Sequence, residues 1–179
     1  MANTQQSEDT RRIVLTGFMG SGKSTVGPLL AARLGWRFVD VDVHIEAEAG
    51  TTIAALFASE GEPAFRARER AAIARLAAGE SLVRALGGGA IEDPATRTLL
   101  IEAGGTLLIH LEVELATTLG RCRGTEGTRP ILADRANLEV RYARRLPLYR
   151  IAHLSIQVDA LTPEEVAEAI HQYAKPHLV

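Results

Sequence analysis

The chain has 179 residues and a formal net charge of −2; 46% of its residues are hydrophobic and 23% are charged. This length suits one domain with a proper core, and the near-neutral charge gives no reason to expect a nucleic-acid or membrane partner. The single cysteine excludes an internal disulfide, and no run approaches the ~20 apolar residues of a membrane span. We therefore expect a cytoplasmic protein.

The first eleven residues, Met1 to Arg11, are polar and lack the apolar segment of a signal peptide. We expect these residues to form a disordered tail. Residues 12–179 contain no linker, internal repeat or low-complexity tract, so they are predicted to form a single domain.

Strand-like and helix-like segments alternate along this domain. Short apolar runs predict strands at residues 12–16, 36–39, 81–86, 105–111 and 155–158. Helical patterns and capping residues predict helices at residues 25–34, 43–49, 52–58, 63–78, 94–102, 114–119, 137–149 and about 163–173. This alternation is typical of an α/β fold, with a parallel sheet between two layers of helices.

The most informative segment follows the first predicted strand. Residues 17 to 24 have the sequence Gly-Phe-Met-Gly-Ser-Gly-Lys-Ser, a complete G-x-x-x-x-G-K-[ST] phosphate-binding loop. In such a loop, backbone N–H groups and the start of the next helix surround the phosphates. The lysine can reach the β- and γ-phosphates, and the last serine can ligate Mg²⁺. The predicted phosphate-binding residues are Gly20, Ser21, Gly22, Lys23, Ser24 and Thr25.

The loop alone does not identify the reaction, but the rest of the sequence disfavours several classes. The glycine spacing differs from the G-x-G-x-x-G of dinucleotide-binding proteins. The Asp-x-x-Gly and Asn-Lys-x-Asp motifs of regulatory GTPases are absent, and the third predicted strand ends in glycines rather than in the acidic residue usual in motor proteins. Small-molecule kinases remain, and these need a second pocket for an acceptor.

Two acidic residues, Asp40 and Asp42, follow the second predicted strand, at the sheet edge where open α/β folds bind ligands. Because alternate positions of a strand point to the same side, both carboxylates can face one cleft. One can hold Mg²⁺ through water, and the other can bind or deprotonate a substrate hydroxyl. Asp42 also precedes a helical pattern, so a helix N-cap is its alternative role.

Arg66 and Glu69 lie one helical turn apart, so Glu69 can hold the guanidinium of Arg66 ready to bind a carboxylate. By pattern alone, an exposed ladder of charges is the simpler interpretation.

The third predicted strand is followed by Gly87, Gly88 and Gly89, where the backbone can approach a ligand closely. A loose turn is the alternative.

Arginines are frequent in the last third of the chain. Arg121, Arg123 and Arg129 belong to a polar loop that could close over ATP and neutralise the transferring phosphoryl group, or could be a solvated surface loop.

The next predicted helix ends with Arg144 and Arg145, one of which could reach the acceptor pocket, although cations near a helix C-terminus are also common. The five histidines show no metal-ligand spacing, and His110 is expected to be a satisfied core or strand-end residue.

Taken together, these segments resemble bacterial shikimate kinases, from about Ile13 to Ile170. The resemblance is carried by segments that occur in order along the chain: Gly17–Gly27, Phe38–Asp42, Glu62–Glu69, Gly87–Gly89, Arg129–Pro130 and Arg145–Tyr149. It implies a P-loop fold of the nucleoside-monophosphate-kinase type, a three-layer αβα sandwich around a five-stranded parallel sheet. It also implies a substrate-binding helical region at about residues 43–78 and a lid at about residues 121–132.

The resemblance implies ATP-dependent phosphorylation of the 3-hydroxyl of shikimate, in the biosynthesis of chorismate and aromatic amino acids, with Mg²⁺ as cofactor. By position it implies shikimate binding by Asp42, Arg66, Gly87, Gly88, Gly89 and Arg145. It assigns phosphate and metal contacts to Lys23, Ser24 and, through water, Asp40, lid and adenine contacts to Arg121, Arg123 and Arg129, and catalysis to Lys23, Asp42 and Arg129. We expect a monomer.

Arg84 departs from the apolar third strand that is usual in this family, and a charge there must reach solvent, a carboxylate or a ligand. Two other functions stay open. A gluconate-kinase-like enzyme of the same fold would lack the combination of Phe-Arg-x-x-Glu and the triple glycine. A nucleotide-binding regulatory module would have no need of Asp42, Arg66 and Arg145.

Overall fold

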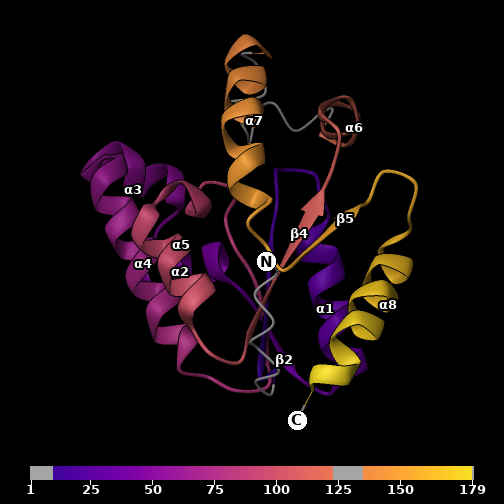
Figure 1. Ribbon diagram of the computed structural model, residues 1–179. Helices are drawn as coiled ribbons and strands as arrows, with labels where there is room; N and C mark the ends of the chain where they lie inside the picture. Colours follow the sequence, from indigo (N-terminus) through magenta and orange to yellow (C-terminus); the bar gives the residue numbers. More distant parts are fainter. Residues whose placement is uncertain (1–9, 123–134, 179) are drawn as a thin grey trace.

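The computed structural model describes residues 10–122 and 135–178. At its centre is a parallel sheet of five strands in the order β2-β3-β1-β4-β5. The strands are β1 (Arg12–Thr16), β2 (Arg37–Asp40), β3 (Leu82–Ala85), β4 (Thr106–Glu112) and β5 (Leu154–Gln157). Helices lie on both sides of this sheet (Figure 1), so the predicted α/β sandwich is confirmed.

The helices form two groups around the sheet (Figure 1). Helices α1 (Lys23–Leu34) and α8 (Pro163–Ala174) pack together on one side of the sheet. The other group comprises α2 (Val41–Ala49), α3 (Ile53–Glu60), α4 (Glu62–Ala77) and α5 (Pro94–Glu102). Beyond the carboxyl ends of the strands lie α6 (Leu115–Arg121) and α7 (Arg135–Tyr149). Two 3-10 turns complete the described elements, η1 (Ala90–Glu92) and η3 (Lys175–His177).

The core lies on both faces of the central strands. Most side chains of β1 and β4 are buried on both faces, among them Ile13, Val14, Leu108 and Ile109. The edge strands β2 and β5 are instead half-exposed. This difference explains why β1 and β4 are largely apolar runs, as expected for parallel strands that helices cover on both sides. Among the described residues, no helix is long and apolar enough to span a membrane.

Helices α1 and α2, which flank the predicted site, each begin two residues earlier than the sequence predicted. Helix α1 begins at Lys23, because Gly22 adopts the left-handed conformation and its carbonyl accepts from the N–H groups of residues 25 and 26. Helix α2 begins at Val41, because Asp40 Oδ1 accepts from the N–H groups of Asp42 at 3.0 Å and Val43 at 3.3 Å. Asp40 is therefore the N-cap, and the alternative that Asp42 caps the helix is wrong.

Thr10 and Arg11, which the sequence placed in the tail, are held in the fold. The backbone of Thr10 bridges to Leu178, and the backbone N–H of Arg11 donates to the carbonyl of Gly105 at 2.9 Å. Arg11 also pairs with Glu80 at 2.7 Å. The expected disordered tail is thus wrong for these two residues, and residues 1–9 lie outside the described part of the chain.

Arg84 is 1% exposed and lies in the middle of the sheet. Its Nη1 donates to the carbonyl of Ile73 at 3.3 Å, near the end of α4, and the guanidinium of Arg12 donates to the carbonyl of Ala77, the last residue of that helix. Burial, together with the charge of Arg12, lowers the pKa of Arg84 to about 10, so it stays charged at neutral pH. The partner of Arg84 is therefore a backbone carbonyl of α4, which none of the three expected destinations included, and its Nε has no hydrogen-bond partner among the described residues.

Helix α1 approaches β2 unusually closely at Gly27. A Cβ atom at this position would overlap the ring of Phe38. Only a residue without a side chain lets the helix that carries the phosphate-binding loop pack directly on the strand that ends in Asp40. We expect Gly27→Ala to lower the free energy of unfolding by about 1–3 kcal/mol, because overpacking outweighs the better helix propensity of alanine.

Chemical denaturation measures this effect, with Gly120→Ala as the matched control. Gly120 also lies in a helix, but a Cβ there would meet nothing within 4 Å. The control should be neutral or slightly stabilising, and equal effects of the two substitutions would contradict the packing argument.

Candidate active site

The phosphate-binding loop is a tight backbone turn between β1 and α1. Gly17, Gly20 and Gly22 have φ values of 151°, 74° and 92°, which favour glycine. A Cβ at Gly17 would lie 2.5 Å from the carbonyl oxygen of Leu111 on β4, so the loop is pressed against the carboxyl edge of the sheet. Ser21 within the loop is buried.

Lys23 folds back over the loop from the first turn of α1. Its Nζ donates to the carbonyl oxygens of Gly17 at 2.7 Å and Phe18 at 3.1 Å, and lies 3.4 Å from Ser21 Oγ. These contacts hold the ammonium group at the rim of the loop, where it can meet the outer phosphates of a nucleotide.

Ser24 and Asp40 form the pair that could hold a metal ion. Ser24 Oγ donates to Asp40 Oδ2 at 2.9 Å, while the other oxygen of Asp40 caps α2. The pair offers only oxygen ligands, as Mg²⁺ prefers, and Mg²⁺ usually takes few ligands from the protein. Over residues 10–122 and 135–178 there is no group of three His, Cys, Asp or Glu side chains that could hold a metal without help from a ligand.

One cleft of about 560 Å³ brings most of the predicted site residues together. Its described lining comprises Met19, Gly20, Gly22, Lys23, Ser24, Thr25, Asp40, Asp42, Leu86, Gly87, Gly88, Arg121, Cys122 and Arg145. Asp40 and Asp42 face the same cleft, as the sequence predicted. The reason differs, however, because Asp42 lies in the first turn of α2 rather than on the strand.

The carboxyl group of Asp42 is largely withdrawn from water at this cleft. Burial raises the pKa of Asp42 to about 6, and the nearby charge of Asp40 adds to the rise, while Lys23 and Arg66 oppose it. A Cβ at Gly87 would lie 2.7 Å from Asp42 Oδ1, so the carboxylate packs directly on the glycine backbone. Asp42 is still mostly ionised at neutral pH, with a basicity suited to accepting a proton.

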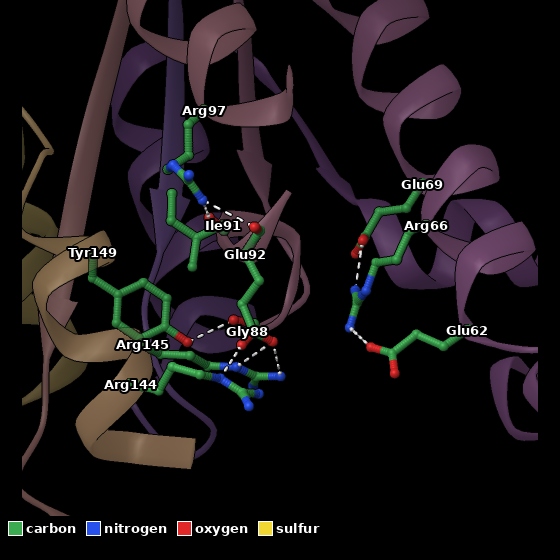
Figure 2. Close-up of polar contacts among 10 residues, drawn as sticks. All are labelled: Glu62, Arg66, Glu69, Gly88, Ile91, Glu92, Arg97, Arg144, Arg145 and Tyr149. Atoms are coloured by element: carbon green, nitrogen blue, oxygen red, sulfur yellow. Dashed lines mark hydrogen bonds and ion pairs between the residues drawn. The ribbon is translucent and has the colours of Figure 1, made fainter. Parts of the chain in front are cut away.

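Arg66 and Glu69 form the ion pair that the sequence offered as one of two interpretations. Arg66 Nη1 donates to Glu69 Oε2 at 2.6 Å, and Nη2 lies 3.4 Å from Glu62 Oε1 (Figure 2). Glu69 is 2% exposed, so the alternative of an exposed charge ladder is wrong for this pair. The guanidinium carbon of Arg66 also lies 5.4 Å from the ring centroid of Phe65, which favours a cation–π contact.

Arg145 lines the cleft from α7, and its main partner is a residue that the sequence did not single out. Glu92 Oε2 accepts from Arg145 Nε at 3.1 Å and from Nη2 at 2.9 Å, while Oε1 accepts from Arg144 Nε at 2.6 Å (Figure 2). No periodicity marks Glu92, because its partners are more than fifty residues away in the chain. The only signal was an acid three residues beyond the triple glycine.

The three glycines are ordered by the side chains around them. Tyr149 OH donates to the carbonyl of Gly88 at 2.6 Å, and the segment continues into the turn η1. A Cβ at Gly89 would overlap Arg66 Nη2 and lie 2.9 Å from Arg145 Nη2. The alternative of a loose turn is therefore wrong, and the two guanidiniums converge at Gly89. Arg66 and Gly89 lie beside the cleft rather than in its described lining.

The remaining predicted residues lie at the nucleotide side or in the core. Arg121 Nη1 donates to the carbonyl of Gly20 at 2.9 Å, beside the phosphate-binding loop. Arg123 and Arg129 lie outside the described residues, as does most of the expected lid. His110 is a core residue, as expected: it bonds Ser155 Oγ at 3.1 Å, stacks on Tyr149, and burial lowers its pKa to about 4.

The chain is similar to known proteins in sequence and in fold. The family model described as shikimate kinase matches residues 19–175. A shikimate kinase of Salinibacter ruber is 43% identical over 179 residues, which cover 92% of this chain and 87% of the relative.

Two solved structures are also similar to this chain. A shikimate kinase from Acinetobacter baumannii in complex with shikimate has a TM-score of 0.83 and 36% identity, with 94% of each chain covered. A shikimate kinase from Bacteroides thetaiotaomicron has a TM-score of 0.85 and 28% identity, with 92% of this chain and 98% of that chain covered.

The buried Glu69 predicts a pH-dependent stability. Burial raises the pKa of Glu69 from its ordinary value of 4.5 to about 7, although Arg66 opposes the rise. The folded state thus binds this proton more tightly than the unfolded state, so the contribution of Glu69 to stability is fully present below about pH 4.5 and is lost as the pH rises through about 7.

We expect the free energy of unfolding of the wild type to fall relative to Glu69→Gln by on the order of 2 kcal/mol between about pH 5 and pH 8. Urea unfolding of both proteins across this range measures the difference. Parallel curves for the two proteins would show that Glu69 does not titrate in this way.

Proposed function

The chain belongs to the shikimate kinase family, and we propose that it transfers the γ-phosphoryl group of ATP to the 3-hydroxyl of shikimate, within chorismate and aromatic amino acid biosynthesis. The single observation that carries this proposal is the cleft between the phosphate-binding loop and the two convergent arginines. It joins a nucleotide side to a side suited to a small anionic polyol.

At the acceptor side, Arg66 and Arg145 would bind the carboxylate of shikimate, with Gly88 and Gly89 beneath it. Planar guanidiniums match a carboxylate with paired hydrogen bonds, and each is already held by a glutamate. Asp42, packed on Gly87, would accept hydrogen bonds from the hydroxyls. A buried site of this kind rejects an acceptor without these groups, because its own polar atoms would be left unpaired.

At the nucleotide side, residues 20–25 would surround the phosphates and Lys23 would contact the transferring group. Ser24 and, through water, Asp40 would hold Mg²⁺, which would neutralise negative charge on the β- and γ-phosphates. Arg129 would stabilise the same group from the lid. Arg121 and Arg123 would lie near the adenine, and the contact of Arg121 with Gly20 supports that side for Arg121.

Asp42 would act on the attacking hydroxyl. Its carboxylate, ionised at neutral pH, would orient this hydroxyl toward the phosphoryl group and accept its proton. Lys23 would stabilise the charge that develops on the transferring group. The transfer is direct, without a covalent intermediate on the protein.

The proposal extends to the state and location of the protein. We propose a monomer that works in the cytoplasm, without a nucleic-acid or membrane partner, since its net charge is −2 and it has a single cysteine. Light scattering at several concentrations tests the monomer.

A coupled assay of ADP release with Mg·ATP tests the reaction. We expect release that depends on shikimate and not on gluconate or quinate. Release with gluconate alone would favour the rival kinase of this fold. Nucleotide binding with no acceptor-dependent release would favour a regulatory module.

Two substitutions test the assigned roles. Lys23→Ala should lower kcat at least about 100-fold, because it removes a charge that acts on the transferring phosphoryl group. Arg66→Ala should mainly raise KM for shikimate, about 10-fold or more, since a hydrogen bond to a charged group contributes about 1.5–3 kcal/mol.

Arg68→Ala is the matched control for Arg66, because Arg68 lies on the same helix and pairs with Glu60 at the surface. It should leave the kinetics unchanged. Normal turnover in Lys23→Ala would reject the role of Lys23, and an unchanged KM in Arg66→Ala would reject that of Arg66.

A further inference from the structure

We propose that Glu92 is a positioning residue, which fixes the guanidinium of Arg145 so that the cleft selects an acceptor with a carboxylate. This inference rests on the proposed function, and it concerns a residue that does not itself line the described cleft. It is carried by the contacts of Glu92, by the side from which it approaches Arg145, and by the like charges nearby.

Glu92 holds one edge of the Arg145 guanidinium. A single oxygen, Oε2, accepts from both Nε and Nη2 of Arg145, at 3.1 and 2.9 Å. The second oxygen accepts from Arg144 Nε at 2.6 Å, so both oxygens of the carboxylate are engaged (Figure 2). Arg97 Nη1 donates to the backbone carbonyl of Glu92 at 3.0 Å, which steadies the turn that carries it. These contacts therefore fix both the position and the rotation of the Arg145 guanidinium.

Glu92 approaches Arg145 from outside the cleft. Arg145 is among the residues that line the cleft, whereas the described lining does not include Glu92. Glu92 does not bind Nη1, which lies near Gly88: a Cβ there would lie 3.5 Å from it, while Nη2, which Glu92 does bind, is the Arg145 atom nearest Gly89. Glu92 thus orients the arginine through Nε and Nη2, and we expect an acceptor carboxylate to bind on the side of Nη1.

Like charges near Arg145 make this support necessary. Arg141, Arg144 and Arg66 all lie close to it: Arg141 has its pKa lowered by burial and then by the charge of Arg145, and Arg66 shares the approach to Gly89. Burial alone would raise the pKa of Glu92, but ion pairs with Arg145 and Arg144 outweigh it and lower the pKa, so Glu92 is ionised at neutral pH. Without Glu92, repulsion would drive the Arg145 side chain toward solvent.

Arg66 is held in the same manner by Glu69, from a different element. The two guanidiniums that meet at Gly89 are therefore each fixed by a carboxylate, and the two carboxylates come from different elements. A guanidinium that is fixed before binding loses less side-chain freedom on binding, and this favours the anionic ligand.

Steady-state kinetics of Glu92→Ala and Glu92→Gln test this role with two acceptors, shikimate and its methyl ester. The ester keeps the hydroxyls but removes the carboxylate charge. We expect Glu92→Ala to lower kcat/KM for shikimate about tenfold, through KM, which corresponds to about 1.4 kcal/mol. Glu92→Gln should have a smaller effect, because its amide oxygen can still accept from Arg145. The KM for ATP should not change.

The comparison with the ester separates positioning from folding. For the ester, kcat/KM should stay within about twofold of the wild type; if the ester is turned over too slowly, its inhibition constant against shikimate replaces this value. A loss of folded protein would reduce both acceptors equally, so the ratio between them is the deciding quantity. Glu80→Ala is the matched control, since Glu80 forms a surface ion pair with Arg11. It should change neither acceptor.

An equal loss for both acceptors, or no change in either, would overturn the role of Glu92. A wild-type protein that fails to phosphorylate shikimate would instead reject the proposed function, and this outcome is recognised before any variant is made.

Discussion

Two guanidiniums, those of Arg66 and Arg145, meet at Gly89, and the rest of the acceptor side depends on this meeting of like charges. Positive groups that are largely withdrawn from water repel one another unless carboxylates lie beside them. Glu69 and Glu92 provide these carboxylates, one for each guanidinium. The two guanidiniums also require a residue without a side chain at Gly89, because a Cβ there would occupy the space in which they lie.

The nucleotide side depends on backbone geometry rather than on charge pairs. Gly17 and Gly22 have positive φ values, and Gly27 lets α1 pack directly on Phe38. The same close packing brings Ser24 at the start of α1 to within 2.9 Å of Asp40 at the end of β2. The glycines thus let the phosphate-binding loop lie close to the strand end that carries Asp40. Both halves of the cleft lie along the same edge of the sheet.

Features that depend on neighbouring residues could be predicted from the sequence, and features that depend on distant ones could not. The loop at Gly17–Ser24 and the five strands follow from local spacing, whereas the same kind of spacing allowed the Arg66–Glu69 pair but favoured an exposed ladder of charges. The N-cap at Asp40 shows the limit of this approach, because the same two acids allowed either residue to cap α2. The carbonyl of α4 that binds Arg84 lies eleven residues before it on another element, and the pairing of Glu92 with Arg145 joins residues 53 positions apart. No periodicity records such contacts, so only the folded chain reveals them.

The buried acids Asp42 and Glu69 show that features suited to substrate binding can lower the stability of the fold. Burial raises the pKa of Asp42 to about 6 and that of Glu69 to about 7, so keeping both ionised at neutral pH opposes folding. Glu69 Oε1 has no hydrogen-bond partner among the described residues, which adds to this opposition. Neutral residues in these places would favour the folded state, but they would remove a basic group from the cleft and an anchor from Arg66. The fold tolerates this loss of stability because burial of the apolar strands β1 and β4, which helices cover on both faces, stabilises the folded state.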